Sequence, residues 1–314
     1  MQGCGHSIFD PMRVDTLLVA VDFSDTAEEA ARWASHVFAP SARVVLLHVI
    51  DPPDRPRFAR DRLPPPGTFE DIAREHATAR LRELTERLAR QDIRVEIRIG
   101  KPYEQVAAVA TEVSASLVVI GPHGDRLRPS KFLGTTADRI ARTSPVPILV
   151  VTTPPENAPK RILVPVADAA LTPRVMEWTS ALAEEFDARV TLLHVWSNAV
   201  YSHVASMSYA RKPTEAAARE EITKELRDAA TSWLQELVPS DTARHRFAAT
   251  ISYGRAGDAV LEQAHEGKAE LIILGRSGTS LVMPALLGST TNTVLHGARC
   301  PVLVVTRDGD GSPS

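Results

Sequence analysis

The chain has 314 residues, a formal net charge of −3 at pH 7 and an isoelectric point near 6.4, so its length allows about two domains with separate cores. The balanced charge lacks the clustered basic face of nucleic-acid-binding proteins, and no run of about eighteen apolar residues occurs that could cross a membrane. With two cysteines outside CxxC spacing and no apolar core for a secretory signal after Met1, we expect a cytoplasmic protein that binds neither nucleic acid nor membrane.

The first half of the chain alternates apolar runs with helical patterns. The runs are rich in Val, Ile and Leu without polar alternation, which is typical of strands buried on both faces of a parallel sheet. We predict strands at 16–21, 44–49, 94–99, 117–121 and 147–152, and helices at 25–38, 67–91, 103–114 and 135–143. The proline-rich segment 51–66 predicts a loop.

The second half repeats this order after a short spacer at 153–160, which contains three prolines. We predict strands at 161–166, 190–195, 247–252, 270–274 and 301–306, and helices at 172–186, 213–237, 256–266 and 290–297. The predicted fold class is α/β, with two tandem doubly wound (Rossmann-like) domains at 13–153 and 160–307. Each is expected to be a five-stranded parallel sheet with helices on both faces.

A glycine pattern occurs once in each half. Gly121, Gly124 and Gly134 recur with the same spacing as Gly275, Gly278 and Gly288. In both copies two residues separate the first pair of glycines, nine separate the second pair, and a hydroxyl residue, Thr135 or Ser289, follows. The flanking strands repeat as well, with VVLLHV answering to VTLLHV. A tandem duplication of one domain explains this similarity.

The first glycine of each copy follows an apolar strand, and open α/β sheets bind ligands at the carboxyl ends of their strands. Glycine there permits a turn with positive φ and a close approach to the backbone amides. The third glycine opens a helix, whose free N–H groups and positive dipole favour an anion. The pattern therefore predicts a phosphate-binding turn in each half. The alternative is that these residues only form turns and helix caps, but the duplication favours phosphate binding.

With these motifs, the chain resembles the universal stress protein family in its tandem form, over 13–153 and 160–307. The resemblance rests on the G-2x-G-9x-G-(S/T) pattern, which both halves match. It implies an ATP-binding member, in which ATP, AMP or ADP, with magnesium as an optional companion, sets conformation during a stress response. In that branch an Asp after the first strand and a Val after the second also hold the nucleotide.

Matched residue by residue, the resemblance implies a nucleotide site in each half. In the first half its members are Ala20, Asp22, Val49, Ile120, Gly121, His123, Gly124, Gly134, Thr135 and Thr136. In the second half they are Pro165, Val195, Leu274, Gly275, Ser277, Gly278, Gly288, Ser289 and Thr290. Asp22 would accept hydrogen bonds from adenine or ribose, Val49 would offer backbone groups to adenine, and the glycine turn would hold the phosphates. No catalytic residue and no metal ligand is implied.

The second half departs from the family pattern at one position. Ala167 stands where Asp22 stands in the first half, and Asp168 follows one residue later. A carboxylate moved by one residue normally points elsewhere, so we expect the first site to be the stronger. Arg126, Arg128 and Lys131 follow the first GxxG turn and could reach phosphates or be solvated.

Other residues and functions receive less support. His48 and His194 recur at strand ends without a second ligand at useful spacing, which favours a structural role, and His123 is a weak candidate base because Ser277 replaces it.

The alternative functions are an interaction and dimerisation module without nucleotide, a weak ATPase, or an adenylating or electron-transferring enzyme, whose SGGxDS-type loop or flavin site is not visible. The apolar closing strands PILVV and PVLVV are predicted to pair with each other within one chain, and a further homodimer stays open.

Overall fold

The computed structural model describes residues 14–52, 66–124, 133–167, 172–196, 213–238, 244–276 and 287–306, apart from the side chains at 66–68, 213–223 and 226. The first half contains β1 (Thr16–Ala20), α1 (Asp25–Trp33), η1 (Ala34–Phe38), β2 (Arg43–Ile50), α2 (Pro66–Leu88), β3 (Ile93–Ile99), α3 (Pro102–Glu112), β4 (Leu117–Ile120), α4 (Thr135–Thr143) and β5 (Ile148–Val150). The second half contains β6 (Arg161–Pro165), α5 (Thr172–Glu185), β7 (Arg189–Trp196), α7 (Pro213–Glu236), η3 (Arg244–Arg246), β8 (Phe247–Tyr253), α8 (Ala256–Glu266), β9 (Leu271–Gly275), α9 (Ser289–Gly297) and β10 (Val302–Val305).

The predicted order of strands and helices is confirmed in both halves, with one change of geometry. The helix predicted over 25–38 is α-helical only to Trp33 and continues as a π-helical turn over Ala34–Phe38. This turn places Phe38 in the core, where it is 1% exposed. No described helix is long and apolar enough to cross a membrane.

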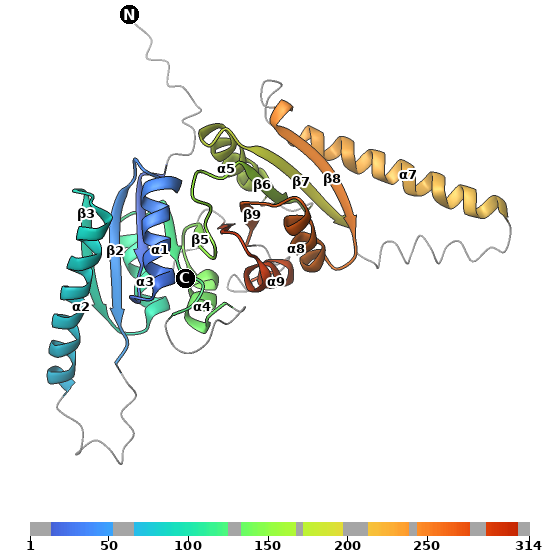
Figure 1. Cartoon of the computed structure of the whole chain (residues 1–314). Coiled ribbons are helices and arrows are strands. Elements are labelled where there is room, and N and C mark those ends of the chain that lie inside the picture. Colours follow the sequence, from blue (N-terminus) through green and yellow to red (C-terminus); the bar gives the residue numbers. More distant parts are fainter. Residues whose placement is uncertain are drawn as a thin grey trace, which may run out of the picture.

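The strands form one sheet of ten, in the order β3-β2-β1-β4-β5-β10-β9-β6-β7-β8. Neighbouring strands within each half are parallel, as predicted for two five-stranded sheets. The two sheets join because β5 and β10 pair antiparallel, with Leu303 opposite Leu149. The predicted pairing of the two closing strands is therefore confirmed. In Figure 1 the halves lie on either side of this junction, with α2 and α7 at opposite ends.

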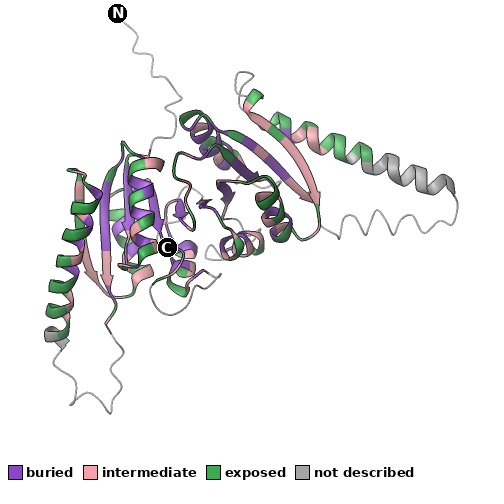
Figure 2. Cartoon of the chain, in the orientation of Figure 1, coloured by how far each residue is buried: buried purple, intermediate pink, exposed green. Residues whose placement is uncertain are grey.

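Helices cover both faces of the sheet, as its uninterrupted apolar central strands require. The edge strands β3 and β8 contain polar residues and are only partly buried, in contrast to the prediction for these two strands. Buried residues of α1, α2, α5 and α7 pack on one face, and those of α3, α4, α8 and α9 pack on the other. Figure 2 shows the buried residues concentrated in the central strands and on the helix faces toward them. The first of these cores continues from one half into the other, where the Phe38 and Phe186 rings meet edge to face with centroids 5.5 Å apart.

The junction between the halves provides a test of stability. Leu303 is fully buried between Leu149 and Ile273, so Leu303→Ala leaves a cavity and should lower the free energy of unfolding by about 2–5 kcal/mol. Urea denaturation measures this change. The control Ile72→Ala removes a side chain that is 64% exposed and should change it by less than about 0.5 kcal/mol. Equal effects of the two substitutions would contradict the assigned junction.

Candidate functional site

The first-half candidate residues follow three neighbouring strands, β2, β1 and β4. Val49 lies near the end of β2, Ala20 ends β1 shortly before Asp22, and Ile120 ends β4 directly before Gly121. The chain leaves β1 toward β2 on one side and later returns to β4 on the other. In doubly wound sheets such a reversal of strand order leaves a crevice at the carboxyl ends of the strands, where ligands bind.

Asp22 is held by the start of the helix that follows it. Its Oδ1 accepts hydrogen bonds from the Ser24 backbone N at 3.1 Å and from Ser24 Oγ at 2.6 Å. Ser24 is the N-cap of α1, because its side chain accepts from Ala27 N. Ser24, and not Asp22, therefore caps this helix. The Asp22 residue remains exposed, so its carboxylate can still accept a hydrogen bond from a ligand.

Two glycines of the pattern, Gly121 and Gly124, lie in close contacts, and neither has the positive φ that the sequence predicts. A Cβ added to Gly124 would overlap Asp22 Oδ2, which places the carboxylate directly against the second glycine of the turn. A Cβ added to Gly121 would lie 3.1 Å from Ala27 N and 3.2 Å from the Thr26 carbonyl carbon. The turn after β4 therefore packs at Gly121 against the backbone at the start of α1, and a side chain there would separate them. A side chain at Gly124 would displace the Asp22 carboxylate.

Hydrogen bonds hold this turn beside the start of α4. Thr26 Oγ1 donates to the His123 carbonyl at 2.8 Å, and Gly134 N donates to the Pro122 carbonyl, also at 2.8 Å. Both ends of the segment 124–134 are thus fixed, although residues 125–132 lie outside the described part of the chain. The turn and the helix start form one structural unit.

The start of α4 is suited to an anion. Gly134 is its N-cap, and no side-chain hydrogen bond caps the helix. Thr135 and Thr136 form its exposed first positions. Amide groups in the first turn of a helix have no partner within the helix, and the dipole makes this end positive. With the turn at 121–124 beside it, the helix start can receive phosphate oxygens on backbone N–H groups.

His48 supports the crevice from the other side. Its Nδ1 hydrogen-bonds to the Val21 carbonyl at 2.8 Å, and its ring stacks on Phe23 at a centroid distance of 4.3 Å. The Arg80 guanidinium lies over the same Phe23 ring, at 5.1 Å. His194 makes the equivalent bond to the Val166 carbonyl at 3.0 Å. These contacts agree with the structural role predicted for both histidines.

The described part of the second half repeats this framework, with Ala167 at the position of Asp22. Pro165, Val195 and Leu274 lie at the ends of β6, β7 and β9, and Gly275 ends β9. Gly288 is the N-cap of α9, which begins with Ser289 and Thr290. Ala167 has no group that could replace the Asp22 carboxylate. The predicted residues Ser277 and Gly278 lie outside the described residues, as do Asp168, Arg126, Arg128 and Lys131.

The sequence interpretation missed Ser24 and Thr26. Ser24 orients Asp22, and Thr26 ties α1 to the glycine turn. The run DFSDT carries a usable signal, because hydroxyl residues just after a strand and before a helix commonly form caps. The contact from Thr26 to His123 spans 97 residues and could not be inferred from local pattern.

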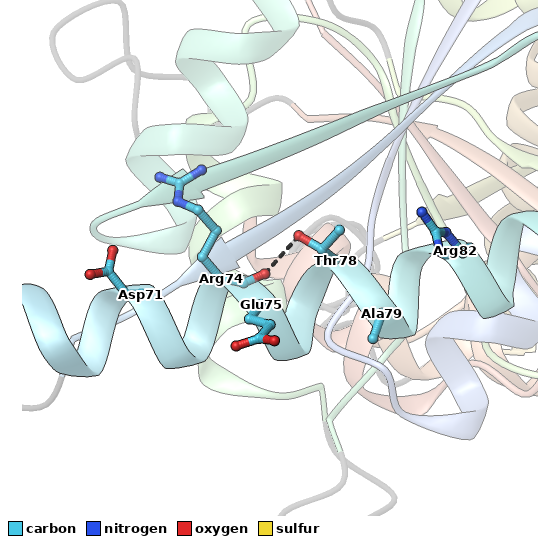
Figure 3. Close-up of a pocket in the computed structure, with 6 residues that line it drawn as sticks. All are labelled: Asp71, Arg74, Glu75, Thr78, Ala79 and Arg82. Carbon is cyan, nitrogen blue, oxygen red and sulfur yellow. Dashed lines mark hydrogen bonds between the residues drawn. The ribbon is translucent and has the colours of Figure 1, made fainter.

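A shallow hollow on α2 is a separate feature (Figure 3). Its lining residues are Asp71, Arg74, Glu75, Thr78, Ala79 and Arg82. All six come from this one helix, and the hydrogen bond drawn there joins Thr78 Oγ1 to the Arg74 carbonyl within the helix. Without a second element to form an opposing wall, this surface is a weaker candidate than the crevice at the strand ends.

The fold and the repeated glycine pattern define a tandem α/β protein. The chain matches the Universal stress protein family over residues 13–152 and 159–306, and it belongs to that family. A universal stress protein of Mycobacterium tuberculosis strain H37Rv is 22% identical, over 94% of this chain and 98% of the relative. Universal stress protein A homolog 2 of Coxiella burnetii is 33% identical, over 48% of this chain and 97% of the relative.

Solved structures agree with the fold. A universal stress protein from Archaeoglobus fulgidus superposes with a TM-score of 0.68 at 19% identity, covering 95% of this chain and 98% of that one. A universal stress protein crystallised in complex with cAMP matches 43% of this chain and 94% of its own, with 24% identity and a TM-score of 0.32. The first likeness shows that the shared fold extends over nearly the whole chain.

The tight contact at Gly121 can be tested by substitution. In Gly121→Ala the new Cβ meets backbone atoms of α1, which must shift, so the free energy of unfolding should fall by about 1–3 kcal/mol. Gly134→Ala is the matched control, because its Cβ would find no atom closer than 3.4 Å. It should cost no more than about 1 kcal/mol, as expected at an N-cap. Thermal or urea unfolding compares the two, and a larger loss in Gly134→Ala would contradict the packing described.

The stability of the protein should depend on pH through His48. Burial is the largest influence on His48 and lowers its pKa from 6.5. The hydrogen bond to Val21 and the charge of Asp22 raise this pKa in part, and His76 lowers it slightly further. The unfolded chain then binds a proton that the folded chain excludes, so the free energy of unfolding falls as pH drops below about 6.5. His48→Asn keeps an N–H donor without titrating, and should lose less stability between about pH 7.5 and pH 5.5. An equal loss in urea unfolding of both proteins would contradict this assignment.

Proposed function

We propose that the first half of the chain binds ATP or a related adenine nucleotide, and that the protein regulates or senses a stress response through the resulting conformation. The observation that carries this proposal is the convergence of Asp22, the turn at 121–124 and the uncapped start of α4 at one end of the sheet. A carboxylate and a positive helix end side by side suit a ligand with hydroxyl or amino donors at one end and an anion at the other.

Each part of the nucleotide has a matching group in the proposed site. The phosphates would lie on the backbone N–H groups of Gly134–Thr136 and of the glycine turn, where dipole and hydrogen bonds act together. Asp22 would accept hydrogen bonds from the ribose or the adenine, and Val49 would contact the base. The buried Nδ1 of His123 has no hydrogen-bond partner among the described residues, so a bound ligand group or water would satisfy it.

The binding role does not require catalysis. Magnesium, when bound, would reach this protein with the phosphates and screen their charge. We assign no general base, so any ATP hydrolysis is expected to be weak. The second half has Ala167 at the position of Asp22 and should bind nucleotide more weakly than the first half. We place the two domains at 13–153 and 160–307. The protein is proposed to act in the cytoplasm, as one chain or as a homodimer.

The nucleotide content of the purified protein tests this proposal. About one adenine nucleotide per chain should be released on denaturation and measured by chromatography. Asp22→Ala should weaken ATP binding by about tenfold or more, because a hydrogen bond to a charged group is lost. Gly124→Val should abolish it, because its side chain displaces Asp22.

Asp25→Ala is the control, since Asp25 is an exposed carboxylate of the same helix start. It should bind ATP like the wild type. Absence of nucleotide on purification, with no binding when ATP and magnesium are added, would overturn the proposal and favour an interaction module. About two nucleotides per chain would show that the second half also binds nucleotide, although it has Ala167 where the first half has Asp22.

A further inference from the structure

We propose that the second half of the chain positions the phosphate-binding helix of the first half, through Arg276 and His296. This inference rests on the proposed nucleotide site of the first half. Both residues belong to the second half, and both contact an end of α4 across the junction. They would act on nucleotide affinity through the placement of α4, without touching the nucleotide.

His296 holds the beginning of α4. Its Nδ1 accepts a hydrogen bond from the backbone N of Leu133 at 3.3 Å. Leu133 is buried and directly precedes Gly134, the N-cap of the helix. His296 lies in the last turn of α9, which contacts α4 at the junction in the centre of Figure 1. A residue of the second half thus fixes the position from which the proposed phosphate-binding amides start.

Arg276 holds the end of the same helix. It is 5% exposed, and its Nη1 donates to the Ser144 carbonyl at 2.7 Å and to the Arg142 carbonyl at 3.2 Å. The last carbonyls of a helix have no partner within it and form the negative end of its dipole. The buried guanidinium of Arg276 donates hydrogen bonds to these carbonyls and places a positive charge at the negative end of the dipole. Arg276 directly follows Gly275 of the second glycine pattern, whereas Pro122 follows Gly121 in the first, so the first half cannot return this contact.

A third contact runs from α4 of the first half to α9 of the second half. Arg142 pairs with Asp138 through two hydrogen bonds of 2.9 Å and also donates to Asn292 Oδ1 at 2.8 Å. Asn292 lies near the start of α9, as Asp138 does in α4. The last turn of each helix therefore contacts the beginning of the other. A shift of α4 along its axis would break contacts with the second half at both of its ends.

This arrangement has a consequence for binding. A helix fixed at both ends presents its first amides in one geometry, and a site organised before binding loses less free energy on ordering its ligand. Removing the contacts should let α4 shift and weaken binding at the first site. Because linkage is reciprocal, a nucleotide on α4 should also strengthen the attachment of the two halves.

The test uses the full chain and titration calorimetry with ATP and magnesium, following the site that Asp22→Ala removes. His296→Ala and Arg276→Met should each weaken this binding by about threefold to thirtyfold, the range of coupling effects from residues outside a site. His296→Asn places an amide oxygen near the Nδ1 position, and Arg276→Lys keeps a buried donor. Both should restore affinity to within about threefold of the wild type.

Phe38→Leu is the control for general loosening of the two halves. It disturbs the Phe38–Phe186 contact, which lies in the core on the other face of the sheet from α4. It should lower stability in urea and leave ATP affinity unchanged. Unchanged affinity in His296→Ala and Arg276→Met, or an equal loss in Phe38→Leu, would overturn the proposal.

A second measurement separates this inference from the proposed function. Hydrogen exchange of the amides in α4 should be faster in His296→Ala and Arg276→Met than in the wild type, with no change in β2 amides. If the wild type binds no ATP, the proposed nucleotide function fails, while the exchange result still decides whether the second half holds α4. Unchanged exchange in α4 would overturn the positioning role, whatever the binding result.

Discussion

The antiparallel pairing of β5 with β10 is the interaction on which the rest of the structure depends. Both strands are fully buried and apolar, and left unpaired they would expose a ladder of backbone N–H and C=O groups. Their pairing converts two five-stranded sheets into one of ten. It also brings α4 and α9 together, because each of these helices directly precedes its closing strand. The contacts of Arg142, Arg276 and His296 between the halves follow from this pairing.

The candidate site depends on a second constraint, the absence of side chains at two glycines. At Gly121 the end of a strand meets the start of α1, and at Gly124 the backbone meets the Asp22 carboxylate. Glycine in these positions therefore packs elements together and does more than form a turn. The same packing places the Asp22 carboxylate against the turn that is hydrogen-bonded to Gly134, the N-cap of α4. Structure and proposed binding thus use the same residues.

The sequence was sufficient for the elements and their pairing. Unbroken runs of Val, Ile and Leu predict buried parallel strands, and the repeated apolar closing strands predict the junction, because both signals arise from local composition. The π-helical turn at Ala34–Phe38 was missed, since no local residue pattern specifies it. Ser24 was missed because its hydrogen bonds to Asp22 depend on how the chain turns between β1 and α1. Arg276 and His296 gave no signal, because their partners lie over 130 residues away. The nucleotide contacts themselves remain predictions.

A crystal structure of the full chain with a non-hydrolysable ATP analogue and magnesium would show where the nucleotide binds. We expect electron density at the carboxyl ends of β1 and β4, with phosphates on the amides of Gly134–Thr136 and the ribose or adenine within hydrogen-bonding distance of Asp22. We also expect that Arg276 and His296 keep their contacts with α4. Density for the analogue at another surface, or none at saturating concentration in crystals whose crevice is open to solvent, would contradict this expectation.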